Sequence, residues 1–191
     1  MKRISLFVFL LLSGFITSEA CTSFLIGKKA SADGSVMITY SMDSYGMFTN
    51  LQHFPAAKHP AGTMRQIVDG DTNHYLGEIP EAPQTYAVMG NINEFQLSIM
   101  ETTFDGREEL VDTTGIIDYV SLMTLGLQRA KTAREAIYVM TDLVEKYGYA
   151  SSGESFSIAD PNEAWILEMI GKGGKEKGAV WVAVRIPDDC I

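Results

Sequence analysis

The chain has few of the residues that most often build metal centres and disulfide frameworks. Its 191 residues include three histidines (His53, His59 and His74) and two cysteines (Cys21 and Cys190). The histidines lack the HExxH spacing and every other familiar zinc-ligand spacing, so we expect solvated loop histidines and no metal site. Two cysteines allow a single bridge, which excludes a small disulfide-stabilised scaffold.

Basic residues are also scarce. The chain carries 15 lysines and arginines against 24 aspartates and glutamates, a net charge of −9. Nucleic acids and anionic membrane surfaces attract basic proteins, so we expect neither as a partner. With 46% hydrophobic and 20% charged residues, the composition is that of one globular domain with a sizeable core. No apolar stretch after residue 20 is long enough to span a bilayer.

The first twenty residues have a composition of their own. Two basic residues precede an almost wholly apolar run over 4–16, and Ser18 and Ala20 place small residues at positions −3 and −1 before Cys21. These are the three parts of a secretory signal peptide. The apolar run is too short to serve as a permanent membrane helix.

We therefore expect residues 1–20 to be removed and residues 21–191 to form the mature chain. Export would make the protein secreted or periplasmic, with no stable membrane span after cleavage. It would also make a disulfide permissible.

The mature chain is predicted to begin with a β-hairpin. Apolar runs over 22–27 and 36–40 flank a polar turn that contains the hairpin signal Asp33-Gly34. Cys21 then lies at the open end of the first strand. Asp43, in the loop after the second strand, is expected close to it.

For the rest of the chain, the sequence predicts irregular segments with short strands over 47–84, followed by strands, two helices and further strands. Apolar residues at helical spacing over 116–127 indicate one helix. A second opens at the capping box Thr132–Glu135 and stops at Gly148. Further strands are predicted over 85–92, 96–103, 156–160, 164–170 and 179–186. This order favours a layered α+β fold.

Three explanations compete for a cysteine directly after the cleavage signal. In a lipoprotein Cys21 would be acylated, but that processing prefers an aliphatic residue where this chain has Ser18. A lone cysteine is usually structural, either buried or bridged, here to Cys190. The third explanation is an N-terminal nucleophile.

An N-terminal cysteine would combine a thiol and a free amine on one residue. The amine has an ordinary pKa of about 7.7–8.0 and can act as a base near neutral pH. The thiol, with an ordinary pKa of about 8.5, is a good nucleophile. No histidine is needed, and a precursor without cleavage would have no base. A nearby carboxylate would hold and tune the amine, and Asp43 is the candidate.

Four segments of the mature chain resemble the dipeptidase A-like cysteine peptidases. These peptidases are N-terminal-nucleophile (Ntn) hydrolases, distantly similar to choloylglycine hydrolase, penicillin V acylase and acid ceramidase. The resemblance covers essentially the whole mature chain. The segments are CTSFLIGKKASADGS (21–35), NINEFQLSIMETTFDGREEL (91–110), FSIADPNEAWILEM (156–169) and WVAVRIPDD (181–189).

The resemblance implies an αββα sandwich of two antiparallel sheets flanked by helices. It implies hydrolysis of dipeptides through a cysteinyl acyl-enzyme, with no metal or organic cofactor. Cys21 matches the nucleophile, and Asp43 matches the aspartate that contacts the nucleophile's amine. Small peptides are the implied substrates, and assembly into a homo-oligomer stays open.

The chain departs from related families in two ways. Choloylglycine hydrolases usually carry an arginine three residues before the aspartate, where this chain has Tyr40. This favours the dipeptidase branch, with an acylase of N-acyl amides, such as bile salts or penicillin V, as the alternative. Family members are also longer, with an "HAN"-type segment whose asparagine completes the oxyanion hole. We therefore expect residues 21–191 to be the N-terminal portion of a peptidase domain, truncated at its C-terminus.

The resemblance also suggests weaker site residues. Glu101-Thr102-Thr103 falls where the superfamily places a substrate and oxyanion contact, so Thr103 or its neighbour Thr102 is a candidate for the oxyanion pocket. Glu101 is either the partner of a dipeptide's ammonium or a solvated carboxylate. Arg185 either binds the substrate carboxylate or forms a structural ion pair.

Overall fold

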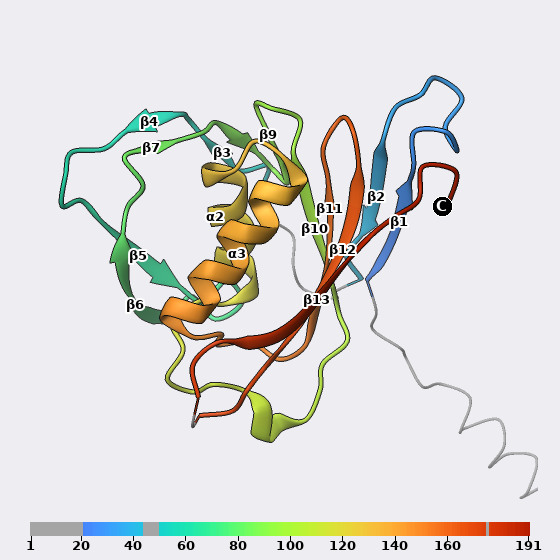
Figure 1. The fold of residues 1–191 in the computed structure, drawn as a ribbon. Helices are drawn as coiled ribbons and strands as arrows, with labels where there is room; N and C mark the ends of the chain where they lie inside the picture. Colours follow the sequence, from blue (N-terminus) through green and yellow to red (C-terminus); the bar gives the residue numbers. More distant parts are fainter. Residues whose placement is uncertain (1–20, 44–49, 175) are drawn as a thin grey trace, which may run out of the picture.

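The computed structural model describes residues 21–43, 50–174 and 176–191. The chain is an α+β protein in which a seven-stranded antiparallel sheet carries two helices on one face and a β-hairpin on the other (Figure 1). The predicted signal peptide, residues 1–20, lies outside the described residues. Within the described ranges, no helix is both long enough and apolar enough to cross a bilayer.

The predicted N-terminal hairpin is confirmed. β1 (Thr22–Ile26) pairs antiparallel with β2 (Met37–Ser41), and Thr22 lies opposite Ser41 at the open end. Leu25 on β1 packs against small residues of the large sheet, in a cluster separate from the main core. This packing holds the turn end of the hairpin against the sheet, and near the open end Ser23 Oγ lies 3.4 Å from Thr102 Oγ1 on β10.

The large sheet has the strand order β13-β12-β11-β10-β9-β8-β3. Its strands are β3 (His53–Phe54), β8 (Val88–Met89), β9 (Ile92–Asn93), β10 (Ser98–Thr103), β11 (Glu154–Ala159), β12 (Ala164–Gly171) and β13 (Ala179–Arg185). Outside it lie two short pairs and one 3-10 turn: β4 (Ala57–Lys58) with β7 (Gln84–Thr85), β5 (Met64–Val68) with β6 (Tyr75–Pro80), and η1 (Glu108–Leu110).

Four of the five predicted later strands are confirmed with small shifts of their ends. The predicted strand over 85–92 is wrong, because it is broken into short pieces that belong to different sheets. The Tyr86 amide donates to Gln128 O at 2.9 Å, and the Ala87 amide donates to a carboxylate oxygen of Glu94 at 2.9 Å. These two amides are therefore not available for hydrogen bonds between neighbouring strands. Gly90, with a φ of 55°, turns the chain.

α2 (Tyr119–Arg129) begins later than its apolar spacing predicted. Its N-cap is Asp118, whose carboxylate accepts hydrogen bonds from the amides of Ser121 and of Gly70. Ile117, which the spacing had placed inside the helix, instead donates its amide to Gly148 O. Because the buried Asp118 side chain caps the helix, α2 begins after Asp118 and does not include Ile117.

α3 (Ala133–Tyr147) lies where the capping box predicted it. The Thr132 hydroxyl accepts from the Glu135 amide at 3.3 Å, whereas the Glu135 carboxylate accepts from Lys131 N rather than from Thr132 N. The helix ends at Gly148, whose φ of 81° favours glycine. Its apolar face joins α2 and the sheet in the main core.

Asn93 joins the turn before β10 to the end of α2. It is 5% exposed, and its amide group donates to Leu127 O and Ala130 O, both at 2.8 Å. Its side-chain oxygen accepts from the amides of Phe95 and Leu97. The asparagine therefore has a structural role in setting the position of β10.

We expect Asn93→Ala to lower the free energy of unfolding by about 2–4 kcal/mol, because it leaves several buried backbone groups without partners. Urea denaturation followed by circular dichroism would measure the change. Asn162→Ala, at an exposed turn, is the matched control and should change the stability by less than about 0.5 kcal/mol. Equal midpoints for the two variants would contradict this account of Asn93.

Candidate active site

Three side chains from different strands meet at the open end of the hairpin. Cys21, just before β1, is half-buried, and its Sγ lies 3.6 Å from Glu101 Oε1 on β10. The same Sγ lies 3.9 Å from the hydroxyl of Tyr40 on β2. The Tyr40 hydroxyl in turn donates to Glu101 Oε1. The Cys21 thiol and the Tyr40 hydroxyl therefore both donate to the same carboxylate oxygen of Glu101.

The surroundings favour the neutral form of both the Cys21 thiol and the Tyr40 hydroxyl. Burial raises the pKa of the Cys21 thiol, and the negative charge of Glu101 raises it further. The backbone amide of Asp43 and the Tyr40 hydroxyl act in the opposite direction. Burial and Glu101 also raise the pKa of the Tyr40 hydroxyl. A thiol in this setting needs a neighbouring base to become a strong nucleophile.

The backbone of Asp43 lies near Cys21. The backbone of Asp43 is near enough to the Cys21 thiol to lower its pKa. Its side chain is exposed, and one carboxylate oxygen accepts from Ser41 Oγ at 3.1 Å. The structure thus places the backbone of Asp43 near the sulfur and its carboxylate in an exposed position beside Ser41.

The two threonines after Glu101 point to opposite faces of β10. Thr102 Oγ1 faces the hairpin and lies 3.4 Å from Ser23 Oγ. Thr103 Oγ1 lies on the other face, 3.3 Å from Glu101 Oε2 and 2.9 Å from Glu154 Oε1. The Thr103 hydroxyl is therefore already engaged with two carboxyl groups.

Glu154 is a buried residue of this cluster that the sequence did not single out. It begins β11 directly opposite Thr103 and is 1% exposed. Burial raises its pKa to about 8, and the nearby Glu101 charge also raises it. The signal available in the sequence was an acidic residue at the start of a largely apolar strand. Its partners became visible only through the cross-strand register.

Arg185 lies away from Cys21. Arg185 is paired with Trp165 of β12, at the side of the large sheet where β10 begins. Cys21 instead contacts Glu101, toward the other end of β10. The Arg185 guanidinium donates to Glu163 at 3.0 Å and to Asp188 at 2.6 Å. The structure places Arg185 in an ion-pair network and does not bring it together with the thiol.

Both cysteines are free, and a Cys21–Cys190 bridge is excluded in this fold. Cys190 O accepts from the Gly27 amide at 3.0 Å, so Cys190 lies at the turn end of the hairpin. The five residues of β1 separate the two sites by roughly 16 Å, far beyond disulfide reach. Among the described residues, no group of three metal-ligating side chains comes together.

A cavity of about 470 Å³ opens next to the thiol. Tyr40 and Glu101, the two residues in contact with Cys21 Sγ, form part of its wall, together with Met42, Gln52 and Tyr119. Ligand pockets for small molecules commonly measure roughly 300–1,000 Å³. The cavity therefore has room for a small peptide beside the thiol.

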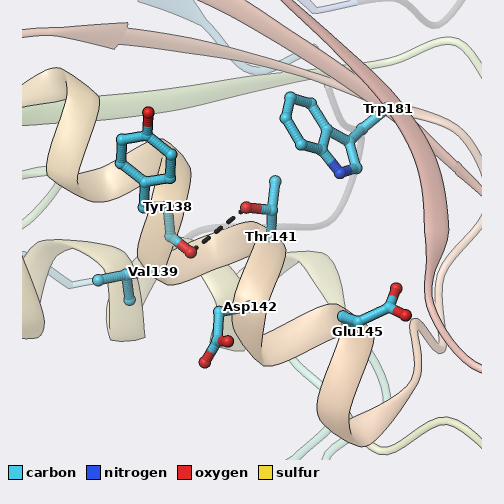
Figure 2. A pocket seen from close by; sticks show the side chains of 6 residues that line it. All are labelled: Tyr138, Val139, Thr141, Asp142, Glu145 and Trp181. Carbon is cyan, nitrogen blue, oxygen red and sulfur yellow. Dashed lines mark hydrogen bonds between the residues drawn. The ribbon is translucent and has the colours of Figure 1, made fainter.

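A second hollow, of about 650 Å³, lies between α3 and β13 (Figure 2). Figure 2 shows Tyr138 and Thr141 on α3 and the indole of Trp181 on β13 around this hollow. Two strands, β11 and β12, separate β13 from β10 in the sheet. The hollow is remote from Cys21, and its lining contains no cysteine or histidine.

Comparisons with known proteins match almost the whole described chain. The model of the family described as Peptidase family C69 matches residues 20–191. A "Probable dipeptidase" of Latilactobacillus sakei is 31% identical over 92% of this chain and 39% of its own length. A "Dipeptidase A" of Lactobacillus helveticus is 32% identical over 88% of this chain and 38% of its own length. The chain thus spans about two fifths of the length of these relatives.

Proposed function

This chain belongs to peptidase family C69, and on that premise we propose that it forms part of a cysteine dipeptidase that acts outside the cytoplasm. The observation that carries the proposal is the Cys21 thiol at the edge of a peptide-sized cavity, 3.6 Å from a buried carboxylate. The names of the relatives, "Dipeptidase" and "Dipeptidase A", support the substrate class.

Cys21 is the proposed nucleophile, and its own α-amine, freed by removal of residues 1–20, is the base. The neutral amine takes the thiol proton, and the sulfur attacks the carbonyl carbon of the peptide bond. The ammonium returns the proton to the leaving nitrogen as the C–N bond breaks, which leaves a thioester. Water, deprotonated by the same amine, then releases the acid and restores the thiol.

Asp43 has two proposed roles in this reaction. Its carboxylate, at the rim of the site, holds and tunes the α-amine. Its backbone amide, which lowers the pKa of the neighbouring thiol, supports the view that the oxyanion forms at this edge, beside the segment Thr102–Thr103. Donors that are already in place when charge develops lower the barrier most.

Glu101 is the proposed partner of the substrate's ammonium. It is 4% exposed, lies in the cavity wall, and contacts the thiol that would attack the adjacent carbonyl. Arg185 is proposed to have a structural role, since both of its acidic partners already occupy it. An N-acyl amide carries no ammonium, so the buried carboxylate favours dipeptides over the acylase alternative.

The proposed architecture is the αββα sandwich of Ntn hydrolases. The helix pair, the large sheet and the β1–β2 hairpin on its opposite face are in keeping with three of its layers. The apolar cluster between hairpin and sheet supports the interface between the two sheets.

We expect Glu101→Gln to raise KM for an unblocked dipeptide about tenfold or more, because the ammonium loses its buried counter-charge. Because the Glu101 charge also raises the pKa of the Cys21 thiol, kcat should change for both substrates, but KM for the same dipeptide with an acetylated amine should change little. Steady-state kinetics on both substrates would measure the shift. Glu109→Gln, an exposed carboxylate on η1, is the control and should behave as wild type. A wild-type enzyme that prefers the acetylated substrate would instead support the acylase alternative.

A further inference from the structure

The hydrogen bonds around Thr103 require a proton that the threonine cannot supply. Its hydroxyl lies 3.3 Å from Glu101 Oε2 and 2.9 Å from Glu154 Oε1. A hydroxyl has one hydrogen and can donate to only one of the two oxygens. The other contact is favourable only if that carboxyl group is protonated and donates to Thr103.

The remaining contacts indicate which carboxyl group holds the proton. Glu101 Oε1 faces the Tyr40 hydroxyl and the Cys21 thiol, both donors, so Glu101 acts as an acceptor. Glu154 Oε2 has no hydrogen-bond partner among the described residues, and Glu154 is 1% exposed. An ionised carboxylate with a bare buried oxygen is far more costly than a neutral one.

Among the described residues, the titratable groups that face Glu154 from neighbouring elements include no cation. Glu101 lies on β10, Asp105 follows β10, Tyr119 is on α2, and Tyr149 follows α3. Tyr149 is buried, and its hydroxyl has no partner among the described residues. No ion pair to Glu154 occurs in the described part of the chain.

We propose that Glu154 is a positioning residue that stays protonated at neutral pH, donates to Thr103, and so leaves Glu101 as the single buried anion beside Cys21. This inference rests on the proposed function, because it concerns the same site. A second negative charge here would oppose both thiolate formation and the oxyanion of the reaction. Glu154 thus limits the charge at the nucleophile without touching the substrate.

The first test measures the reactivity of Cys21 without any substrate. Full-length chains with Cys190→Ala, with and without Glu154→Gln, are exported, purified and alkylated with iodoacetamide across the pH range. A glutamine amide donates to Thr103 as the protonated acid does, but it cannot ionise. At about pH 6 the two proteins should react at equal rates. At about pH 9 the Glu154→Gln protein should react about three- to tenfold faster, because it lacks the second charge.

The second test follows stability against pH. Because the pKa of Glu154 is raised in the folded state to about 8, its contribution is fully present below its ordinary pKa of about 4.5 and is lost as pH rises to about 8. Urea midpoints of the wild type should fall over this window, and those of Glu154→Gln should fall less. If Glu154→Gln does not fold, infrared spectra of the wild type with isotope-labelled glutamate should still show a protonated carboxyl band that is lost near pH 8.

Identical pH profiles for the two proteins, or a wild-type infrared spectrum with no protonated glutamate at pH 7, would overturn the proposal. Dipeptide hydrolysis provides the activity readout: kcat at saturating dipeptide should decline above about pH 8 in the wild type only. Alkylation, unfolding and infrared spectra need no substrate. An enzyme without dipeptidase activity would therefore count against the proposed function, while these three measurements would still decide the role of Glu154.

Discussion

Replacing Cys21 by alanine should reduce dipeptide hydrolysis by about four orders of magnitude or to the detection limit, because the described residues that line the cavity include no other thiol to form the acyl-enzyme. Alanine removes only the sulfur, and the half-buried position tolerates a methyl group. The fold and the cavity should persist. The measurement is the initial rate of dipeptide hydrolysis by purified protein, with circular dichroism as the check on folding.

Cys190→Ala is the matched control for this substitution. Cys190 is the other free cysteine, is exposed, and lies at the far end of the hairpin. Its replacement should leave the rate within about twofold of the wild type, as expected for a surface position away from the site. A Cys21→Ala protein that still turns over dipeptides would refute the proposed nucleophile.

Activity should also depend on a free amine at Cys21. A variant that carries a removable tag in place of residues 1–20, with the protease cutting directly before Cys21, is expected to be inactive until it is cut. A general base contributes about 10²–10⁴-fold to a rate, so the gain on cleavage should be of that order. The same sample, assayed before and after the protease, serves as its own reference.

Chemical modification distinguishes the amine from the mere removal of bulk. Acetylating the new amine under mild conditions, with the thiol reversibly protected, should return the activity to the level before cleavage. Mass spectrometry of the exported wild-type protein should show a chain that begins at Cys21 with an unmodified amine. A diacylglyceryl mass on Cys21 would support the lipoprotein alternative. A mature chain that begins elsewhere would leave the thiol without its base.

Local patterns were sufficient for much of the fold. The hairpin, the late strands and α3 follow from apolar periodicity and from short-range signals such as Asp33-Gly34 and the Thr132 cap. These signals act over a few residues, so the chain itself contains the information. The start of α2 and the predicted strand over 85–92 did not follow from them. There, bonds to distant groups such as Gly70 and Gln128 O overrode the local preference.

The candidate site was likewise predicted only in part from the sequence. The sequence by itself determined Cys21 as the candidate nucleophile, because a cleavage signal and a thiol are adjacent along the chain. Only the tertiary structure decided that Tyr40 and Glu101 contact it, that Glu154 is joined to Glu101 through Thr103, and that Arg185 lies elsewhere. Strand register joins residues that are far apart in sequence, and burial turns ordinary carboxyl groups into groups that must share protons. Neither effect can be read from spacing along the chain.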